Sequence, residues 1–262
     1  MTRIDKTFAR LKAAHQSGFV AYIMGGDPGH EASLELMKAL PDAGVDIIEL
    51  GMPFTDPAAD GPVIELAGLR ALKSGTTVRS VLDMATDFRK TNDDTPIILM
   101  GYANPIHHMV YAEFAAAAKD AGVDGAIIVD LPPEEDGELR TAFEAHDLAL
   151  IRLATPTTDD ARLPRVVAGT KGFVYYVSVA GITGAAKGEN AAISDAVERI
   201  SKASGLPVVV GFGIKTPEQS AEVAKSADAV VVGSAIVDAF FKGGQDAALD
   251  LVRKLSKAAH IF

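Results

Sequence analysis

Cysteine is absent from the 262-residue chain. The sequence therefore excludes disulfide bonds, thiolate nucleophiles and metal sites built on thiolates. Basic residues are also few, because 25 Lys and Arg stand against 35 Asp and Glu and give a net charge of −10. Nucleic acids and anionic membranes are recognised through clustered Lys and Arg, so this charge argues against both as partners. The charge does not exclude a small anionic ligand, because backbone N–H groups can bind it.

Long apolar runs are missing too. No stretch has the uninterrupted apolar length that a membrane-spanning helix needs, and residues 1–16 mix charges throughout and lack the apolar centre of a signal peptide. We therefore expect a cytoplasmic protein.

Several catalytic motifs do not occur. The sequence contains no GxxxxGK[ST] loop, no GxGxxG after an early strand and no GxSxG, which removes the usual nucleotide-loop and esterase signals. His107 and His108 are adjacent but have no further ligands at metal-binding spacing, so we expect an exposed loop pair and no metal site.

What is present is a regular alternation of short Val/Ile-rich runs with helical patterns, in a chain of average hydrophobic (48%) and charged (23%) content. The runs are nearly continuous rather than alternating, as expected of parallel strands covered on both faces. Eight strands are expected, at 19–24, 46–51, 96–101, 125–130, 149–153, 172–178, 207–211 and 229–233. Helices are expected at 3–16, 30–43, 63–73, 77–91, 110–121, 134–145, 158–168, 190–203, 216–226, in a short segment at 233–237 and at the C-terminus.

This pattern predicts one domain, residues 1–262, with the fold of a (β/α)₈ TIM barrel and an extra N-terminal helix that covers one end of the core. An internal echo supports the repetition, since DAGVD occurs at 42–46 and again at 120–124. Its glycines, Gly44 and Gly122, suit the left-handed position after a helix. An open doubly wound sheet is the alternative, but no division into two halves favours it.

Active sites of such barrels lie at the carboxyl ends of the strands, which singles out Glu49. Glu49 lies two residues from Ile47 and so shares its face, which the neighbouring apolar residues mark as interior. Burial raises the pKa of a carboxyl and suits it to proton transfer near neutral pH. A structural carboxylate bonded to backbone N–H groups is the other interpretation.

Other polar residues follow the same strand ends. Asp60 lies in the loop after the second strand, where it is either a catalytic carboxylate or a turn cap. Asp56 and Asp27 each precede a proline, which favours a role in turns. Tyr102 and Asp130 are expected at the ends of the third and fourth strands, and Tyr175 is expected inside the sixth.

Glycines after the last two strands predict a phosphate site. GFGI (211–214) and GSAIV (233–237) occupy the loops that often bind phosphate in barrels, with a helix N-terminus beside them. Gly213, Gly233 and Ser234 are the candidate donors, and the barrel would be of the phosphate-binding type. The alternative is that these glycines only end tightly packed strands.

A third glycine-rich stretch, SVAGITGAAKGEN (178–190), predicts a mobile lid over the site. A plain solvated connector is the alternative.

Together these stretches resemble the tryptophan synthase α-subunit family. The matching segments are GGDPG (25–29), ELGMPFTDPAADGP (49–62), GYANP (101–105), VDLPPEE (129–135), YYVSVAGITG (175–184), GFGI and GSAIV, in order from about residue 18 to about residue 240. The ELG-PF-DP-ADGP pattern is specific to the family, whereas the glycine motifs occur in many phosphate-binding barrels.

The resemblance implies retro-aldol cleavage of indole-3-glycerol phosphate to indole and glyceraldehyde 3-phosphate, with no cofactor in this subunit. It implies that Glu49 is the general acid/base, that Asp60 lies near the indole N–H, and that Tyr175 helps to place Glu49. Thr183 would meet Asp60 when the lid closes. The implied phosphate donors are Gly184, Gly213, Gly233 and Ser234, and the implied indole-pocket walls are Tyr22, Ile64, Met100, Tyr102, Ile127 and Phe212.

Some positions depart from the familiar pattern of the family. Tyr22 stands where Phe is familiar and Met100 where Leu is, and both keep an apolar pocket. Val179 stands where Arg is frequent, which removes a charge from the lid.

The resemblance also implies a partner, the pyridoxal-phosphate-dependent tryptophan synthase β subunit, in an α₂β₂ tetramer. The segment from Pro53 to Asp56 and the pair Asn104 and Pro105 would face that partner. A free-standing indole-3-glycerol phosphate lyase and a non-catalytic regulatory barrel that binds the phosphate ester are the alternatives.

Overall fold

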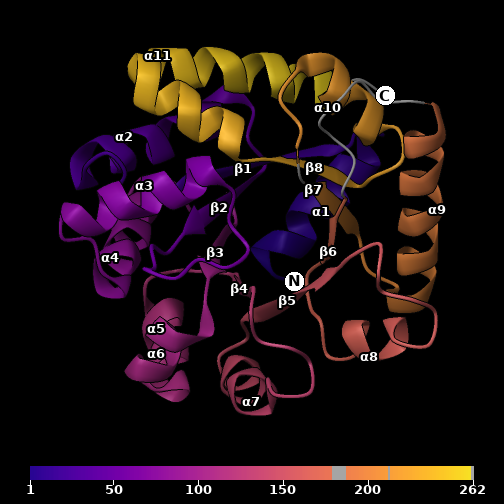
Figure 1. The fold of residues 1–262 in the computed structure, drawn as a ribbon, viewed down its shortest axis with the longest axis horizontal. Coiled ribbons are helices and arrows are strands. Elements are labelled where there is room, and N and C mark those ends of the chain that lie inside the picture. Colours follow the sequence, from indigo (N-terminus) through magenta and orange to yellow (C-terminus); the bar gives the residue numbers. More distant parts are fainter. Residues whose placement is uncertain (179–186, 212, 261–262) are drawn as a thin grey trace.

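Eight parallel strands close into a barrel in chain order, as the computed structural model, which describes residues 1–178, 187–211 and 213–260, shows (Figure 1). The (β/α)₈ barrel is therefore confirmed and the open sheet is excluded. The strands are β1 Gly18–Met24, β2 Ile47–Gly51, β3 Ile97–Gly101, β4 Gly125–Ile128, β5 Ala149–Ala154, β6 Val174–Val177, β7 Val208–Gly211 and β8 Ala229–Val232.

Helices surround the barrel and cover the outer faces of its strands (Figure 1). Their bounds are α1 Arg3–Ala13, α2 His30–Ala39, the 3₁₀ turn η1 Pro41–Ala43, α3 Pro62–Lys73, α4 Val78–Arg89, α5 Ala103–Met109, α6 Tyr111–Asp120, α7 Gly137–Ala145, α8 Leu163–Val167, α9 Lys187–Ser204, α10 Pro217–Ala224 and α11 Ser234–Ala259.

Four features differ from the expectation. Residues 103–105 of the GYANP stretch form the start of α5, a helix too short to carry an apolar period. Asp130 does not end β4 but lies beyond it, and its carboxylate accepts a hydrogen bond of 2.8 Å from the Ala103 N–H at the start of α5. The expected helix 158–168 is shortened to α8. After β8 the expected short helix and the terminal helix are the two arms of α11, which meet at Gly244 with φ of 72°.

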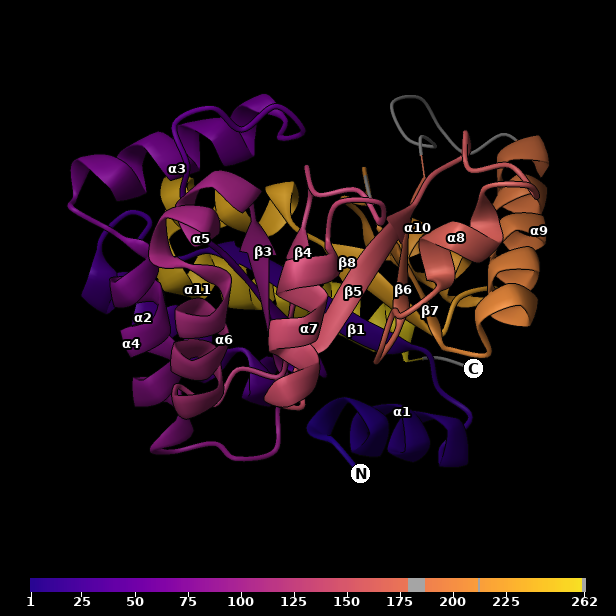
Figure 2. The same ribbon diagram turned by 90° about the horizontal axis from the view of Figure 1, so that it is seen from below.

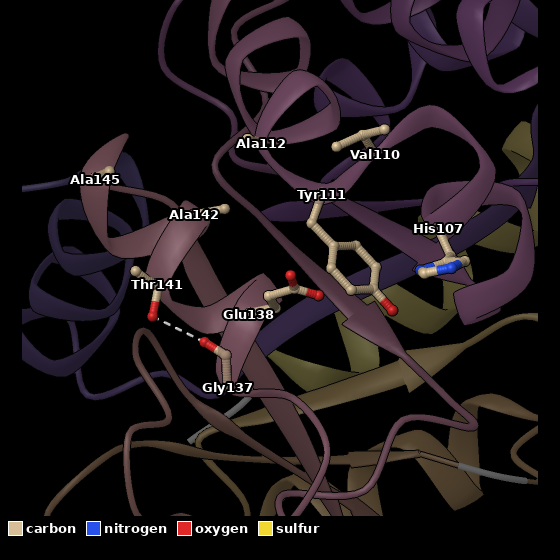
Figure 3. Close-up of a pocket in the computed structure, with 9 residues that line it drawn as sticks. All are labelled: His107, Val110, Tyr111, Ala112, Gly137, Glu138, Thr141, Ala142 and Ala145. Atoms are coloured by element: carbon tan, nitrogen blue, oxygen red, sulfur yellow. Dashed lines mark hydrogen bonds between the residues drawn. The ribbon is translucent and has the colours of Figure 1, made fainter.

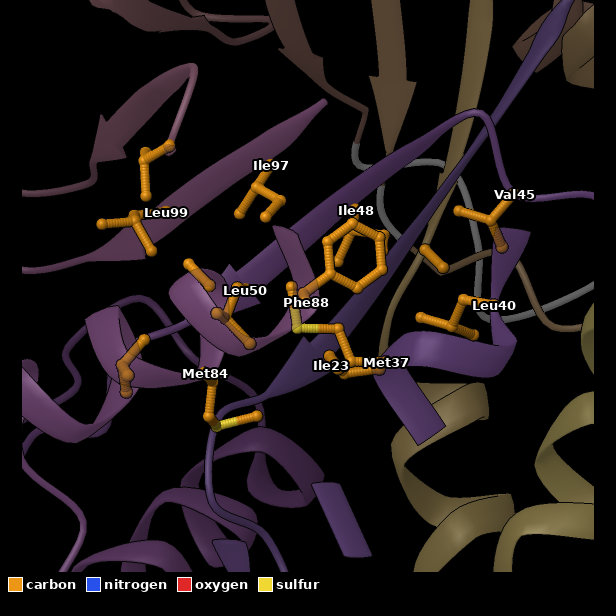
Figure 4. Close-up of a cluster of buried hydrophobic side chains, with 14 of the residues drawn as sticks. Ile23, Met37, Leu40, Val45, Ile48, Leu50, Met84, Phe88, Ile97 and Leu99 are labelled. Atoms are coloured by element: carbon orange, nitrogen blue, oxygen red, sulfur yellow. The ribbon is translucent and has the colours of Figure 1, made fainter. Parts of the chain in front are cut away.

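Alternate strand residues build two apolar layers. Outward side chains such as Ile48 and Leu50 pack against α2 and α4 through Met37, Met84 and Phe88 (Figure 4). Inward side chains fill the lumen, among them Val20, Ile47, Ile98, Ile127, Ile151, Val209 and Val231. Burial on both faces explains why the strands read as continuous apolar runs.

Helix α1 closes the end of the barrel where the strands begin (Figure 2). Ile4 joins the lumen cluster, and the rings of Phe8 and Phe173 meet edge to face with centroids 6.0 Å apart. Gly172 has φ of 81°, and a Cβ there would lie 3.1 Å from Ile4, so glycine lets the helix approach closely. The predicted cover at one end of the core is confirmed.

The DAGVD echo has a structural cause at this end of the barrel. Asp46, Asp124 and Asp228 directly precede β2, β4 and β8, and each makes the same double contact with the preceding strand. The backbone N–H of each aspartate donates to a carbonyl at 2.9, 2.9 and 3.0 Å, and its carboxylate accepts from the N–H of the same residue at 2.8, 2.9 and 2.8 Å. The partner residues are Phe19, Ile97 and Val208, respectively.

Basic side chains reinforce two of these aspartates. Asp124 pairs with Arg3 of α1 at 3.2 Å and with Arg89 of α4 at 2.9 Å. Burial alone would raise the pKa of Asp46, but hydrogen bonds from His260, Arg10 and the Phe19 N–H hold it below its ordinary range. These contacts join α1, α4 and the end of α11 to the rim of the barrel.

We expect Asp124→Ala to lower the free energy of unfolding by about 3 to 5 kcal/mol, because it leaves buried guanidinium and N–H groups without their acceptor. Asp228→Ala is the matched control, because Asp228 is exposed and its carboxylate holds the Val208 N–H; the expected loss is about 1 kcal/mol. Urea unfolding followed by circular dichroism measures both. Equal losses would contradict the role given to the buried arginine contacts.

Candidate active site

Glu49 projects into the lumen near the carboxyl end of β2. Strand register sets it beside Tyr22 of β1 and Ile98 of β3, and it is 1% exposed. Neither carboxylate oxygen has a hydrogen-bond partner among the described residues, so the interpretation of Glu49 as a carboxylate held by backbone N–H groups is not supported. Burial raises the pKa of Glu49 to about 8. The carboxyl is therefore mostly protonated at neutral pH and titrates just above it.

Two tyrosines flank Glu49, and each phenol extends over a glycine of the next strand. A Cβ on Gly51 would lie 2.3 Å from the Tyr22 hydroxyl oxygen, and one on Gly211 would lie 2.2 Å from that of Tyr175. Any side chain at either glycine would displace the phenol. Burial, followed by the charge of Glu49, raises the pKa of Tyr175; the pKa of Tyr22 is raised by burial and then by Asp60 and Glu49. Both hydroxyls therefore stay protonated and can donate.

Asp60 lies half-buried in the loop after β2, beside Tyr102 at the end of β3. The Tyr102 hydroxyl accepts from the Ala59 N–H at 3.1 Å. Burial raises the pKa of Asp60, a hydrogen bond with Tyr102 lowers it, and the charge of Glu65 raises it again. The pKa of Tyr102 itself rises to about 12, chiefly through burial. The structure thus brings two carboxyl groups to the mouth of the barrel, the end where the strands finish. Their surroundings are unlike, and Asp60 has a phenol donor beside it.

The glycine motif after β8 meets the mouth at the start of α11. Gly233 occupies the N-cap position and Ser234 is the first helical residue, so backbone N–H groups at this helix end are suited to an anion. A Cβ on Gly233 would lie 3.2 Å from the Cβ of Tyr22, which shows how near this helix end comes to the lumen. Gly213, after β7, has φ of 78°.

Apolar walls complete the mouth. Ile64 of α3 and Met100 of β3 pack against the cluster that contains Tyr22, and Ile127 is fully buried in the lumen. Sequence reasoning missed three further lumen residues, Val129, Leu153 and Val177, which are partly buried against the lumen cluster of Ile47, Ile98 and Ile127. Each lies two positions after a buried lumen residue, so a register assigned from period 2 would have found them.

Several predicted residues lie outside the described part of the chain. These are Thr183 and Gly184, which fall with Val179 in residues 179–186, and Phe212. The predicted lid spans mostly the same residues.

Two hollows lie near or outside the mouth. One of about 460 Å³ opens between the segments that follow β4 and β5 and is lined partly by Val129, Ile151 and Leu153. A larger one, of about 710 Å³, lies on the outer surface beside α6 and α7, where Tyr111 stands between His107 and Glu138 (Figure 3). The outer hollow is lined by residues of α5, α6 and α7 and by none of the strands described. Barrels place their active sites at the carboxyl ends of the strands, so the chemistry is better placed in the lumen.

Comparisons with known proteins agree on one family. A model of the family described as "Tryptophan synthase alpha chain" matches residues 8–260.

The chain belongs to the tryptophan synthase α-chain family.

Tryptophan synthase α chains from Caulobacter vibrioides strain NA1000 and Caulobacter strain K31 are each 60% identical over 236 residues, which cover 90% of this chain and 86% of each relative. Among solved structures, the α subunit from Legionella pneumophila strain Paris is 41% identical with a TM-score of 0.92 and covers 99% and 98% of the two chains. Tryptophan synthase from M. tuberculosis is 32% identical with a TM-score of 0.92 and full coverage.

The four residues that the family resemblance directs toward a partner differ in exposure. Asp56 and Asn104 are exposed, Pro105 is half-buried, and Pro53 is buried. The Thr55 hydroxyl donates to the Asp56 carboxylate at 2.8 Å, as expected of a turn. Asp56, Asn104 and Pro105 therefore form the accessible part of this set, whereas Pro53 supports the loop from within.

Asp27 does more than make a turn. Its carboxylate is 2% exposed and receives two hydrogen bonds from the Arg70 guanidinium, at 2.6 and 2.8 Å. Arg70 belongs to α3, so the pair fixes the turn after β1 to the helix that follows the Asp60 loop. No local sequence pattern joins residues so far apart in the chain.

No group of His, Asp and Glu side chains in the described ranges is arranged to hold a metal ion. Likewise, none of the helices described is long and apolar enough to span a membrane.

The raised pKa of Glu49 predicts a pH-dependent cost to stability in this α-chain. An ordinary glutamate titrates near 4.5, whereas folded Glu49 titrates at about 8. Between these values the folded state keeps a proton that the unfolded state has released, so stability falls as pH rises. From about pH 5 to about pH 8.5, the free energy of unfolding of wild type should fall by on the order of a few kcal/mol relative to that of Glu49→Gln.

Urea unfolding at both pH values measures this difference, with Glu144→Gln on the exposed face of α7 as the matched control. A gap between wild type and Glu49→Gln that does not change with pH would show that Glu49 titrates normally.

Proposed function

We propose that the chain is a carbon–carbon lyase that cleaves indole-3-glycerol phosphate to indole and glyceraldehyde 3-phosphate, as the α component of tryptophan synthase in the cytoplasm. It would act as a single barrel domain of residues 1–262, without a cofactor of its own. The observation that carries the proposal is the fully buried carboxyl of Glu49, whose pKa of about 8 fits both giving and taking a proton. Membership of the family supplies the substrate.

Glu49 would act twice. Its protonated form donates to C3 of the indole, which turns the ring into an electrophilic iminium. The carboxylate so formed takes the proton of the adjacent glyceryl hydroxyl. As that O–H electron pair forms the aldehyde, the C–C bond breaks and its electrons return to the ring. No proton is gained or lost overall, and Glu49 ends protonated, as it began.

Asp60 would serve the other end of the indole. Positive charge develops on the ring nitrogen when C3 is protonated, and an ionised carboxylate beside the N–H stabilises it. Hydrogen bonding with Tyr102 favours that ionised form. Tyr175, which faces Glu49 across the lumen, would place the acid/base against C3, while the apolar walls hold the ring.

The phosphate would lie at the start of α11. Gly233 and Ser234 would present backbone N–H groups there, Gly213 would add one from the loop after β7, and the helix dipole favours the anion. Gly184 belongs to the same proposed set.

We expect Glu49→Gln to lose indole release by about 10³-fold or more, because both proton transfers lose their agent, while ligand affinity changes little. Indole fluorescence reports both quantities cleanly, because the chain contains no tryptophan. Glu144→Gln is again the control and should match wild type. Near-normal turnover of Glu49→Gln would remove Glu49 from its role, and no indole from wild type would favour a non-catalytic regulatory barrel.

The same proposal includes a pyridoxal-phosphate-dependent β subunit that receives the indole in an α₂β₂ tetramer. The accessible residues Asp56, Asn104 and Pro105 border the loop of Asp60 and the end of β3. A partner bound there would touch the segment that positions a catalytic carboxylate, and so would change the rate.

We expect a tryptophan synthase β subunit to raise indole release by the α-chain about tenfold or more, through ordering of the Asp60 loop. Asn104→Lys should weaken this activation and leave the rate of the isolated chain as it was, with exposed Lys119→Glu on α6 as the control. An isolated chain that turns over at full speed and does not respond to the partner would instead be a free-standing lyase.

A further inference from the structure

The Tyr22 hydroxyl has only a weak hydrogen-bond acceptor among the described residues. The residue is 8% exposed, and the partner that the described part of the chain offers the hydroxyl is the thioether sulfur of Met24, at 4.0 Å. A thioether is a weak acceptor, and a buried donor without a good acceptor costs free energy. A phenylalanine would fill the same apolar wall without that cost.

The hydroxyl is directed at the point where the Asp60 loop leaves the barrel. It lies over Gly51, the last residue of β2, so closely that a Cβ there would be 2.3 Å away. At the other end of the side chain, a Cβ on Gly233 would lie 3.2 Å from the Tyr22 Cβ, so the backbone of Gly233 lies close to the base of the tyrosine. The ring is thereby confined with its hydroxyl toward the loop.

Four ionisable groups at this end of the barrel act electrostatically on this hydroxyl. They are Asp60 from the loop after β2, Glu49 from β2, Tyr102 from the end of β3 and Tyr175 from β6, and Asp60 exerts the largest electrostatic effect among them. Glu49 is mostly neutral at pH 7, so Asp60 is the anionic acceptor available to the phenol. Asp60 itself faces Tyr102 and the charge of Glu65.

Bound substrate would make it harder for Asp60 to stay ionised. An indole ring over the carboxylate removes water from it, and desolvation favours the neutral acid. The proposed chemistry needs the ionised form when C3 is protonated. Tyr102 already opposes protonation of Asp60, but its hydroxyl also receives the Ala59 N–H.

We infer that Tyr22 is a positioning residue whose hydroxyl turns from Met24 to Asp60 and keeps that carboxylate ionised while an indole ring covers the site. The inference rests on the proposed function for its substrate class. It assigns to Tyr22 a task that an apolar wall residue does not perform.

The test compares pH profiles of wild type and Tyr22→Phe. Loss of a donor to the charged form raises the pKa of the carboxyl, so the acid limb of the kcat profile should move up by about one pH unit. Within the acid limb the variant should be several-fold slower than wild type, and at pH values above that limb it should approach wild type. Tyr102→Phe should move the same limb in the same direction.

Tyr176→Phe is the matched control, because Tyr176 lies on β6 but packs outside the lumen against the helices. This variant also removes one tyrosine hydroxyl, and it should leave both limbs of the pH profile at their wild-type positions. An acid limb that stays in place in Tyr22→Phe, or a shift confined to the basic limb of Glu49, would overturn the inference.

A second measurement does not depend on cleavage. Binding of indole alone, followed by its fluorescence across the pH range, should weaken at acid pH in Tyr22→Phe and keep the wild-type affinity at alkaline pH. If wild type releases no indole from the phosphate ester, the proposed function fails. If indole binding by Tyr22→Phe follows the wild-type pH profile, the inference fails instead.

Discussion

The placement in the lumen of a carboxyl group that has no hydrogen-bond partner among the described residues is the constraint on which the site depends. Glu49 is buried beside apolar strands, and its charged form is penalised enough to raise its pKa to about 8. Such a group is tolerated because the surrounding frame is closed and rigid, with every strand paired on both sides. In a less rigid barrel, water or a neighbouring donor would reach the carboxyl and return its pKa toward the ordinary value.

Charged contacts are distributed accordingly between the two ends of the barrel. At the end where strands begin, Asp46 and Asp124 hold the rim through backbone N–H groups and basic side chains. At the mouth, the Asp27–Arg70 pair fixes α3 outside the lumen, and Glu49 has no such partner in the part of the chain that the structure describes. An arginine beside Glu49 would stabilise its charged form, lower its pKa and leave it ionised at neutral pH. Among the described residues, the raised pKa of Glu49 therefore depends on the lack of the contacts that stabilise the other end.

Much of this was predictable from local patterns. Continuous Val/Ile runs predict parallel strands, and the position of Glu49 at the end of one run predicts a buried carboxyl, because side-chain direction in a strand follows from spacing alone. Contacts between distant segments were not predictable in this way. The Asp27–Arg70 pair joins residues on different elements, α5 is too short to show a period, and the burial of Pro53 depends on how the loop folds back. The fit of Tyr22 over Gly51 requires the register of two strands, which no single stretch specifies.

The two carboxyl groups lie at the same end of the barrel in unlike surroundings. Burial raises the pKa of both, and it is more complete for Glu49, which is 1% exposed, than for half-buried Asp60. The supply of donors separates them further: neither oxygen of Glu49 has a partner in the described chain, whereas Asp60 has Tyr102. Hydrogen bonds to the charged form lower a carboxyl pKa and desolvation raises it. In the proposed mechanism, the division of labour between proton carrier and charge stabiliser would follow from this difference in burial and from the phenol beside Asp60, and a change of one hydroxyl at the wall would act on the chemistry through Asp60.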